Sequence, residues 1–200
     1  MEESLTHVDI PFDPEASPIF IIQGWDGPFS HRIHGKRDLR YSVDFALPLG
    51  TPVLSGVSGV VKCVWISGFS YDGVDLVSGL GMTGTFVSIA PDHNSDLRVV
   101  YSHLDPNSLC VDRGDHVESG TVLGKTGLSG WVGPIPHLHT HIQRSVCKGP
   151  SATIPFSING IAGSLADAEV VIRTERQFLG FAKIRDQIAS RAGIIMASIG

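Results

Sequence analysis

Short apolar runs separated by turn residues occupy the central part of the chain and most constrain its fold. From Tyr41 to Ile158 these runs are rich in β-branched or aromatic residues, and Gly, Pro, Asn or Asp lies between them. The 23 glycines and 12 prolines of the sequence supply turn positions for many strands. Because no run keeps a sustained helical period, we expect a mostly β fold built as an antiparallel sheet, sandwich or barrel. The expected strands are Tyr41–Ala46, Thr51–Leu54, Gly59–Ile66, Thr85–Ala90, Leu97–His103, Val117–Leu123 and Leu138–Gln143.

The C-terminal part of the chain has a different pattern, with apolar residues at helical spacing. Phe181, Ile184 and Ile188 lie on one face of such a helix, and charged residues lie between them. The pattern predicts an α-helix from about Glu175 to Ala192 that packs on the sheet, with a partner-binding or dimer-forming helix as the alternative. The expected parts of the chain are an N-terminal extension with a strand (1–23), a β domain (24–160) and a helical tail (161–200).

Charge, hydropathy and cysteine content exclude several classes of protein. The net charge is −5, from 15 Lys and Arg against 20 Asp and Glu, and the basic residues are scattered, so we expect no nucleic acid partner. No apolar run approaches the roughly 18 residues that a membrane helix needs, and residues 1–6 lack the basic and apolar regions of a secretory signal. Cys63, Cys110 and Cys147 form no CxxC motif, so neither a disulfide framework nor a thiolate zinc site is expected. Nothing in the sequence indicates an oligomeric state.

Three histidines alternate along one predicted strand near the end of the β domain. His137, His139 and His141 occupy every second position, so on a strand their imidazoles face the same side. If three such imidazoles were buried in a core, their ring nitrogens would lack hydrogen-bond partners unless a ligand or an aqueous cleft supplied them. Because imidazole is a common zinc ligand, the pattern favours a metal-binding strand over an exposed polar strand face.

Further candidate ligands lie upstream of this strand. Asp44 alternates with apolar neighbours whose side chains should face the core. His31 and His34 precede it closely enough for a loop or hairpin to return one of them to the same metal. His103 ends another predicted strand, where a single histidine is more often structural than catalytic.

Four motifs follow one another along the chain. They are an upstream histidine, Asp44–Val53 (Asp-Phe-Ala-Leu-Pro-Leu-Gly-Thr-Pro-Val), Tyr101–Leu104 (Tyr-Ser-His-Leu) and Pro136–His139 (Pro-His-Leu-His). In this order they resemble the motifs of the lysostaphin/LytM-type zinc endopeptidases, which cut cross-links or stem peptides of bacterial peptidoglycan. The glycine-punctuated segment Arg113–Gly124 also resembles the hairpin before that family's last motif. The resemblance covers roughly Gly24 to Phe156 and implies a LytM-like fold, the duplicated hybrid motif.

Carried over residue by residue, the resemblance implies one zinc ion and a pair of catalytic histidines. Asp44 and His139 match two of the zinc ligands. His103 and His137 match the catalytic pair, one of which would take a proton while the other would hold the oxyanion. We expect the two roles to be separable, because only the ligands should be needed for zinc to bind.

Two positions depart from the family's usual pattern. Close relatives place the first ligand four residues before the Asp, and position 40 here is Arg. The segment Phe29–His31 matches the Phe-Ser-His context of a subgroup with a longer insertion, so His31 is favoured over His34 as the third ligand. His141 stands where the family usually has Glu, in His-Leu-His-Phe-Glu, and is expected to be an outer-shell or groove residue, or an extra metal ligand.

The resemblance therefore implies a zinc metalloendopeptidase, a hydrolase acting on peptidoglycan peptides. The alternative is a catalytically inactive LytM-like module that binds cell wall or regulates another hydrolase. Such modules typically lack one or more of the metal or catalytic residues, and here all are present, which favours the enzyme. Its substrate implies a periplasmic, cell-wall or extracellular location, whereas the absence of a visible export signal leaves a cytoplasmic location open.

Overall fold

The computed structural model describes residues 6–15, 21–27, 30–34, 37–66, 84–130, 132, 136–145, 152–161 and 165. All helical or strand structure within these ranges is β-strand. The structure therefore confirms the expectation of a mostly β, antiparallel fold for this part of the chain. The predicted C-terminal helix from Glu175 to Ala192 lies outside the described residues.

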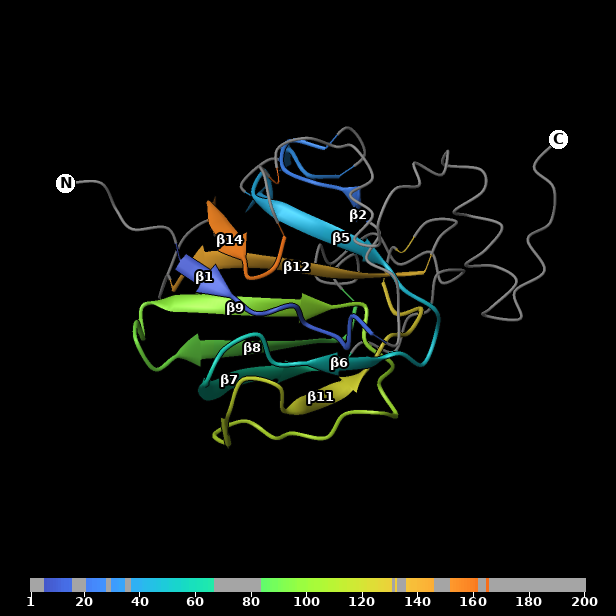
Figure 1. Ribbon diagram of the computed structural model, residues 1–200, viewed down its shortest axis with the longest axis vertical. Helices are drawn as coiled ribbons and strands as arrows, with labels where there is room; N and C mark the ends of the chain where they lie inside the picture. Colours follow the sequence, from blue (N-terminus) through green and yellow to red (C-terminus); the bar gives the residue numbers. More distant parts are fainter. Residues whose placement is uncertain are drawn as a thin grey trace, which may run out of the picture.

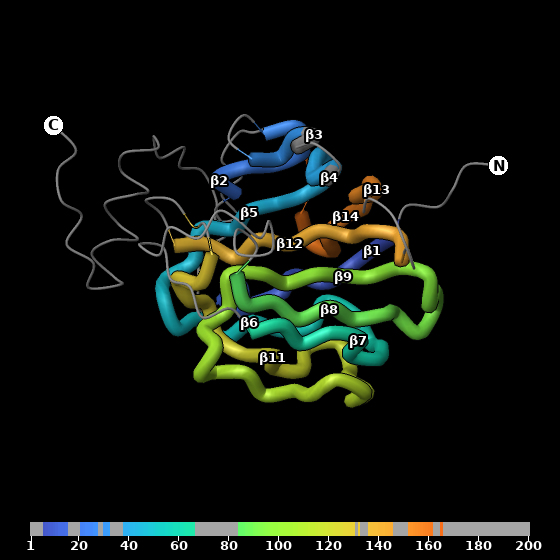
Figure 2. Tube along the Cα trace, turned by 180° about the vertical axis from the view of Figure 1, so that it is seen from behind, coloured from blue at the N-terminus to red at the C-terminus, as the bar shows by residue number. Residues whose placement is uncertain are grey.

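Most of the strands form one antiparallel sheet of eight strands. Its order is β10-β7-β8-β9-β12-β5-β2, and β13 pairs with the last part of β12. Figures 1 and 2 show β5, β12, β9, β8 and β7 side by side in this order. The strands are β2 (Ile21–Gln23), β5 (Ser42–Ala46), β7 (Gly59–Trp65), β8 (Phe86–Pro91), β9 (Leu97–Ser102), β10 (His116–Val117), β12 (His137–Arg144) and β13 (Thr153–Ile154).

Smaller strand pairs cover one face of this sheet. Two views from opposite sides show the β6–β11 and β1–β14 pairs on the same side of it (Figures 1 and 2). The layers are joined where the backbone N–H of Gly56 donates to the hydroxyl of the buried Tyr101 (2.7 Å). Apolar side chains such as Phe12, Phe45 and Leu138 fill the core. The smaller pairs are β1 (Thr6–Val8) with β14 (Phe156–Ile158), β3 (Ile33–His34) with β4 (Arg37–Asp38) and β6 (Pro52–Leu54) with β11 (Val122–Lys125).

The two faces of β12 differ in chemistry. Leu138 and Ile142 are fully buried in the apolar core. Because side chains alternate along a strand, His137, His139 and His141 project from the opposite face of the sheet. The alternation that predicted three like-facing imidazoles is therefore present, and it separates the histidines from the apolar core.

One predicted strand is divided in the structure. The run Val117–Leu123 was expected to be a single strand, but it contributes to both β10 and β11, with a turn between them. In that turn the N–H of Thr121 donates to the carbonyl of Glu118 (3.0 Å), and Gly120 has φ +89°. Glycine adopts this left-handed conformation without steric cost, so the chain turns at Gly120 between the apolar residues Val117 and Val122.

The N-terminal residues take part in the β structure. β1 pairs in parallel with β14, and β2 pairs with β5. The division of the chain at residues 23 and 160 stays a prediction. Among the described residues, we find no helix with the length and apolar character needed to span a membrane.

Candidate metal centre

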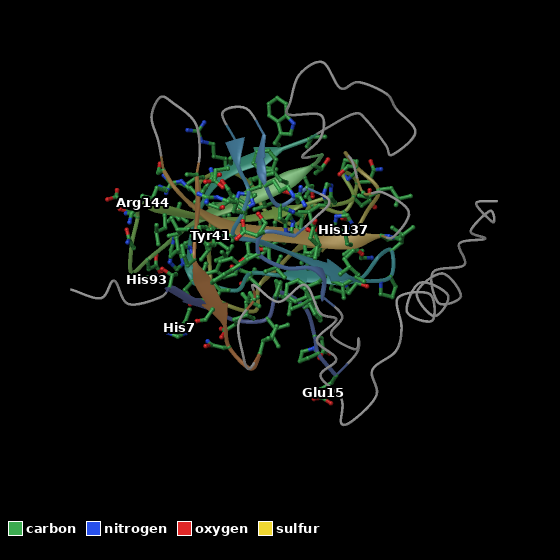
Figure 3. The ribbon with its side chains drawn as sticks, turned by 90° about the horizontal axis from the view of Figure 1, so that it is seen from above. His7, Glu15, Tyr41, His93, His137 and Arg144 are labelled. Carbon is green, nitrogen blue, oxygen red and sulfur yellow. The ribbon has the colours of Figure 1, made fainter. Side chains whose placement is uncertain are left out.

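Pairing of β5 with β12 brings Asp44 and His139 together. The two residues are direct partners in the antiparallel register, and both are buried. Asp44 Oδ1 lies 2.8 Å from His139 Nδ1. His137 comes from the same strand, with Nε2 at 3.9 Å from Asp44 Oδ2. Figure 3 places His137 at one end of β12 and Arg144 at the other, so the centre forms where β12 begins.

His31 reaches the same carboxylate from the segment after β2. Its side chain is fully buried, and its Nδ1 lies 2.7 Å from the carbonyl oxygen of Gly24. This contact leaves Nε2 at 3.2 Å from Asp44 Oδ1, with no hydrogen bond of good geometry to any described residue. The structure therefore brings His31, Asp44 and His139 together, with one ligand atom of each within 4.8 Å of the others. The side chain of His34, the alternative third ligand, lies outside the described part of the structure.

Gln23 orients the carboxylate, a contribution that the sequence analysis missed. Its Nε2 donates to Asp44 Oδ2 (2.9 Å) and to the hydroxyl of Ser30 (3.0 Å), and its Oε1 accepts from the N–H of Ser30 (3.0 Å). A β-bulge in β2 makes this possible, because Ile21 pairs with Phe45 while Gln23 pairs with Asp44. The bulge turns Gln23 toward the centre and leaves Ile21 in the apolar core. No spacing rule would have revealed a bulge in so short a strand.

His103 and His137 lie beside the three clustered residues as a second pair. Their ring centroids are 4.8 Å apart, and His103 is 6.0 Å from the ring of His139. His103 follows the end of β9 with φ +68°, a conformation that is uncommon for a residue other than glycine. Strained backbone of this kind concentrates at functional sites.

Ser129 holds His103 in its orientation and was also missed from the sequence. The carbonyl oxygen of Ser129 lies 2.8 Å from His103 Nδ1. The hydroxyl of Ser129 donates to the carbonyl of Leu104 (2.7 Å) and accepts from the N–H of Thr85 (2.8 Å). His103 therefore keeps its proton on Nδ1 and leaves Nε2 as an acceptor. A sequence carries no signal for a backbone carbonyl that acts in this way.

Burial and the mutual contacts of these groups set their charges. Burial by itself raises the pKa of Asp44, but its histidine neighbours, above all His31 and His137, outweigh this and hold the pKa of the carboxyl well below its usual range. Burial by itself lowers the pKa of His31, but the charge of Asp44 and the hydrogen bonds of the ring together outweigh it, so the pKa of His31 is raised. Burial lowers the pKa of His139 despite its contact with Asp44. Burial, with His137 and His139 nearby, lowers the pKa of His103 to about 3.

This donor set fits a zinc ion. Two imidazoles and a carboxylate, with a fourth position left for water, are typical of catalytic zinc sites. Tetrahedral zinc holds neighbouring ligand atoms about 3.4 Å apart, close to the 2.8 Å and 3.2 Å that separate His139 and His31 from Asp44. The buried Nε2 of His31, without a hydrogen bond in the described part, is the atom that a cation would satisfy. An ionised carboxylate next to a histidine with a raised pKa also indicates a place where positive charge is stabilised.

Comparison with known protein families gives one match. Residues 38–150, more than half of the chain, match Peptidase family M23. The match includes Asp44, His103, His137 and His139, whereas His31 lies before its first residue. A search of curated proteins gave no match.

Solved structures of similar fold include three peptidases or peptidase-like proteins. A zinc containing peptidase from Vibrio cholerae is 24% identical, with a TM-score of 0.51 over 74% of this chain and 39% of that chain. Lysostaphin, known from Staphylococcus simulans, is 23% identical in its solution structure, with a TM-score of 0.51 over 80% of this chain and 57% of that chain. The catalytic domain of the prophage-encoded M23 protein EnpA from Enterococcus faecalis, solved as a point mutant, is 24% identical, with a TM-score of 0.49 over 68% of this chain and 88% of that chain. This chain therefore spans well under two thirds of the first two proteins, and the likeness to them concerns the fold.

Proposed function

The chain belongs to peptidase family M23, and from this membership we propose that it is a zinc-dependent endopeptidase that hydrolyses peptide bonds of bacterial peptidoglycan. Membership implies peptide substrates, and the proposal narrows them to the cross-bridge or stem peptides of the cell wall. We assign the activity to residues 24–160. The observation that carries the proposal is the cluster of His31, Asp44 and His139 beside a second pair of histidines. The zinc content of a Vibrio cholerae peptidase of similar fold supports the choice of metal.

His31, Asp44 and His139 are the residues proposed to hold the zinc ion. When bound, zinc supplies Lewis acidity, which polarises a peptide carbonyl and lowers the pKa of a water molecule toward neutrality. Gln23 keeps the carboxylate of Asp44 in place by donating to Oδ2. The carbonyl of Gly24 accepts from Nδ1 of His31 and so presents Nε2 of that ring to the metal.

His103 and His137 are proposed to handle the proton and the oxyanion. Because Nδ1 of His103 donates to the carbonyl of Ser129 and burial keeps the pKa of this ring low, the ring is neutral and its Nε2 can accept a hydrogen bond from the attacking water. The proton of that water would pass through this contact to the leaving amine. His137, with its ring 4.8 Å from that of His103, is placed to donate a hydrogen bond to the oxyanion that forms on the scissile carbonyl.

Metal content and peptide release, measured on the same preparations, test this function. The zinc-loaded full chain is incubated with purified peptidoglycan, and new amino termini are identified by mass spectrometry. We expect about one zinc per chain in the wild type and in His137→Ala, and none in Asp44→Ala, because only the ligands are needed for binding. Peptide release should be confined to the wild type and to the control His116→Ala, whose side chain is half exposed on β10.

Two outcomes would contradict the proposal. Equal loss of zinc in Asp44→Ala and His137→Ala would contradict the division of roles between ligands and catalytic histidines. Stoichiometric zinc in the wild type without release of any peptide would contradict the endopeptidase itself. Retention of the protein on insoluble peptidoglycan would then favour the binding module.

A further inference from the structure

A line of polar side chains continues from the metal centre along β12. His139, His141 and Gln143 occupy alternate positions on one face of the strand. His139 Nε2 lies 3.0 Å from His141 Nδ1, and His141 Nε2 lies 3.2 Å from Gln143 Oε1. His141 is only 3% exposed. The function proposed above uses neither His141 nor Gln143.

The contacts on the two sides of the His139 ring have different partners. Its Nδ1 faces Asp44 and the group of candidate ligands. Its Nε2 faces His141, away from that group, so His141 contacts the opposite nitrogen of the ring and is placed behind the candidate ligand. An extra ligand would instead have to reach the side on which Asp44 lies.

The positions of the protons along this line depend on one another. When Nδ1 of His139 coordinates a metal, the proton of the neutral ring resides on Nε2. This N–H can donate to His141 Nδ1, which leaves the proton of His141 on Nε2, where it donates to Gln143 Oε1. Each atom in the line is then either a donor or an acceptor, and every contact is satisfied.

We propose that His141 is a positioning residue for the metal centre. It accepts a hydrogen bond from the Nε2–H of His139, which keeps Nδ1 of His139 free of a proton and available to the metal. This inference rests on the proposed function, because it requires a metal at His31, Asp44 and His139. Gln143 extends the line by accepting from His141. His141, at the position where the chain departs from His-Leu-His-Phe-Glu, thus places an acceptor behind the candidate ligand.

Removal of this acceptor should weaken zinc binding. Without His141, the buried Nε2–H of His139 loses its partner, and a buried donor without an acceptor is costly. The ring can avoid that cost by moving its proton to Nδ1, where it faces Asp44, but Nδ1 is then blocked for the metal. Loss of an outer-shell partner typically reduces metal affinity by about 10–100-fold.

Zinc affinity of the full chain, measured by competition with a chromogenic chelator, tests the inference. We expect His141→Ala to weaken zinc binding by about 10–100-fold. His141→Glu should keep most of the wild-type affinity, because a carboxylate also accepts a hydrogen bond from the Nε2–H of His139. Binding of Co²⁺ supplies a second measurement, in which the visible absorption bands should change in His141→Ala and return in His141→Glu. The control is His116→Ala, a histidine on β10 far along the sheet order from β12.

The outcomes separate this inference from the proposed function. Unchanged zinc affinity in His141→Ala, in a wild type that binds zinc, would overturn the inference alone. Equal weakening in His141→Ala and His141→Glu, with both variants folded by circular dichroism, would assign the effect to packing and overturn it as well. A folded wild type that binds no zinc would overturn both the inference and the proposed function.

Discussion

Asp44 lies in the middle of the candidate metal centre, with the other polar side chains of the centre around its carboxylate. Its Oδ1 faces His139 and His31, and its Oδ2 faces Gln23 and His137. Such a carboxylate is already ionised and oriented before a metal arrives, because three histidines and an amide surround it. Affinity for the metal should therefore depend on the partners of Asp44 as well as on the ligands.

Gln23 provides the most direct test of this dependence. The substitution Gln23→Met keeps an unbranched side chain of similar size but removes the hydrogen bond to Asp44 Oδ2, so we expect zinc affinity to fall by about 10-fold or more. The measurement is the dissociation constant for zinc, obtained by chelator competition. Ser30→Ala is the matched control, since it disturbs the same loop contact and leaves the bond from Gln23 to Asp44 in place. An equal effect of both variants would mean that the loop, rather than the carboxylate, responds to the change.

At the level of strands, the sequence predicted the elements that carry the site. The run Tyr41–Ala46 contains β5, and Leu138–Gln143 lies within β12. In both cases the alternation placed the candidate site residues, Asp44 on the first strand and His139 and His141 on the second, on the face opposite the apolar residues before any pairing was known. The register that sets His139 opposite Asp44 follows from the pairing of the two strands, and the resemblance to a family had already linked the two residues.

Other parts of the site could not be predicted from the sequence. The bulge in β2 depends on how Ile21 and Gln23 divide between the two faces of the sheet. The acceptors behind His31 and His103 are the backbone carbonyls of Gly24 and Ser129, which any residue type could supply. Such contacts arise from the packing of segments that are distant in the sequence, so no local sequence pattern predicts them.

Gly84, just before β8, lies against the backbone of Ser129, whose carbonyl orients His103. It precedes β8 with φ +68°, and a Cβ at this position would overlap the carbonyl of Ser129, which holds His103. We expect Gly84→Ala to lower both the free energy of unfolding and the rate of peptide hydrolysis. Gly120→Ala, with φ +89° and open space around it, should cost only about 1–2 kcal/mol for the left-handed backbone and leave hydrolysis unchanged. Urea unfolding and turnover of both variants provide the comparison, and equal effects would contradict a role for the Ser129 carbonyl.

In the molecule as a whole, the candidate metal centre and the apolar core lie on opposite faces of one sheet. Leu138 and Ile142 pack into the core, while the alternate positions of the same strand supply His137 and His139. The core is complete without a metal, because its apolar residues are buried by the smaller strand pairs. Zinc is therefore expected to add stability to a chain that is already folded.

Removal of zinc should lower the melting temperature without abolishing the sheet. The candidate ligands come from the segment after β2, from β5 and from β12, so a bound ion links parts of the chain that are far apart in sequence. A ligand that binds only the folded state adds about 4 kcal/mol at a free concentration 1,000-fold above its dissociation constant. For a chain of this size that corresponds to a rise of roughly 8–16 °C. Thermal melts followed by circular dichroism should show this rise in the wild type and not in Asp44→Ala. A metal-free wild type without β signal at 25 °C would instead mean that the core cannot hold the sheet together by itself.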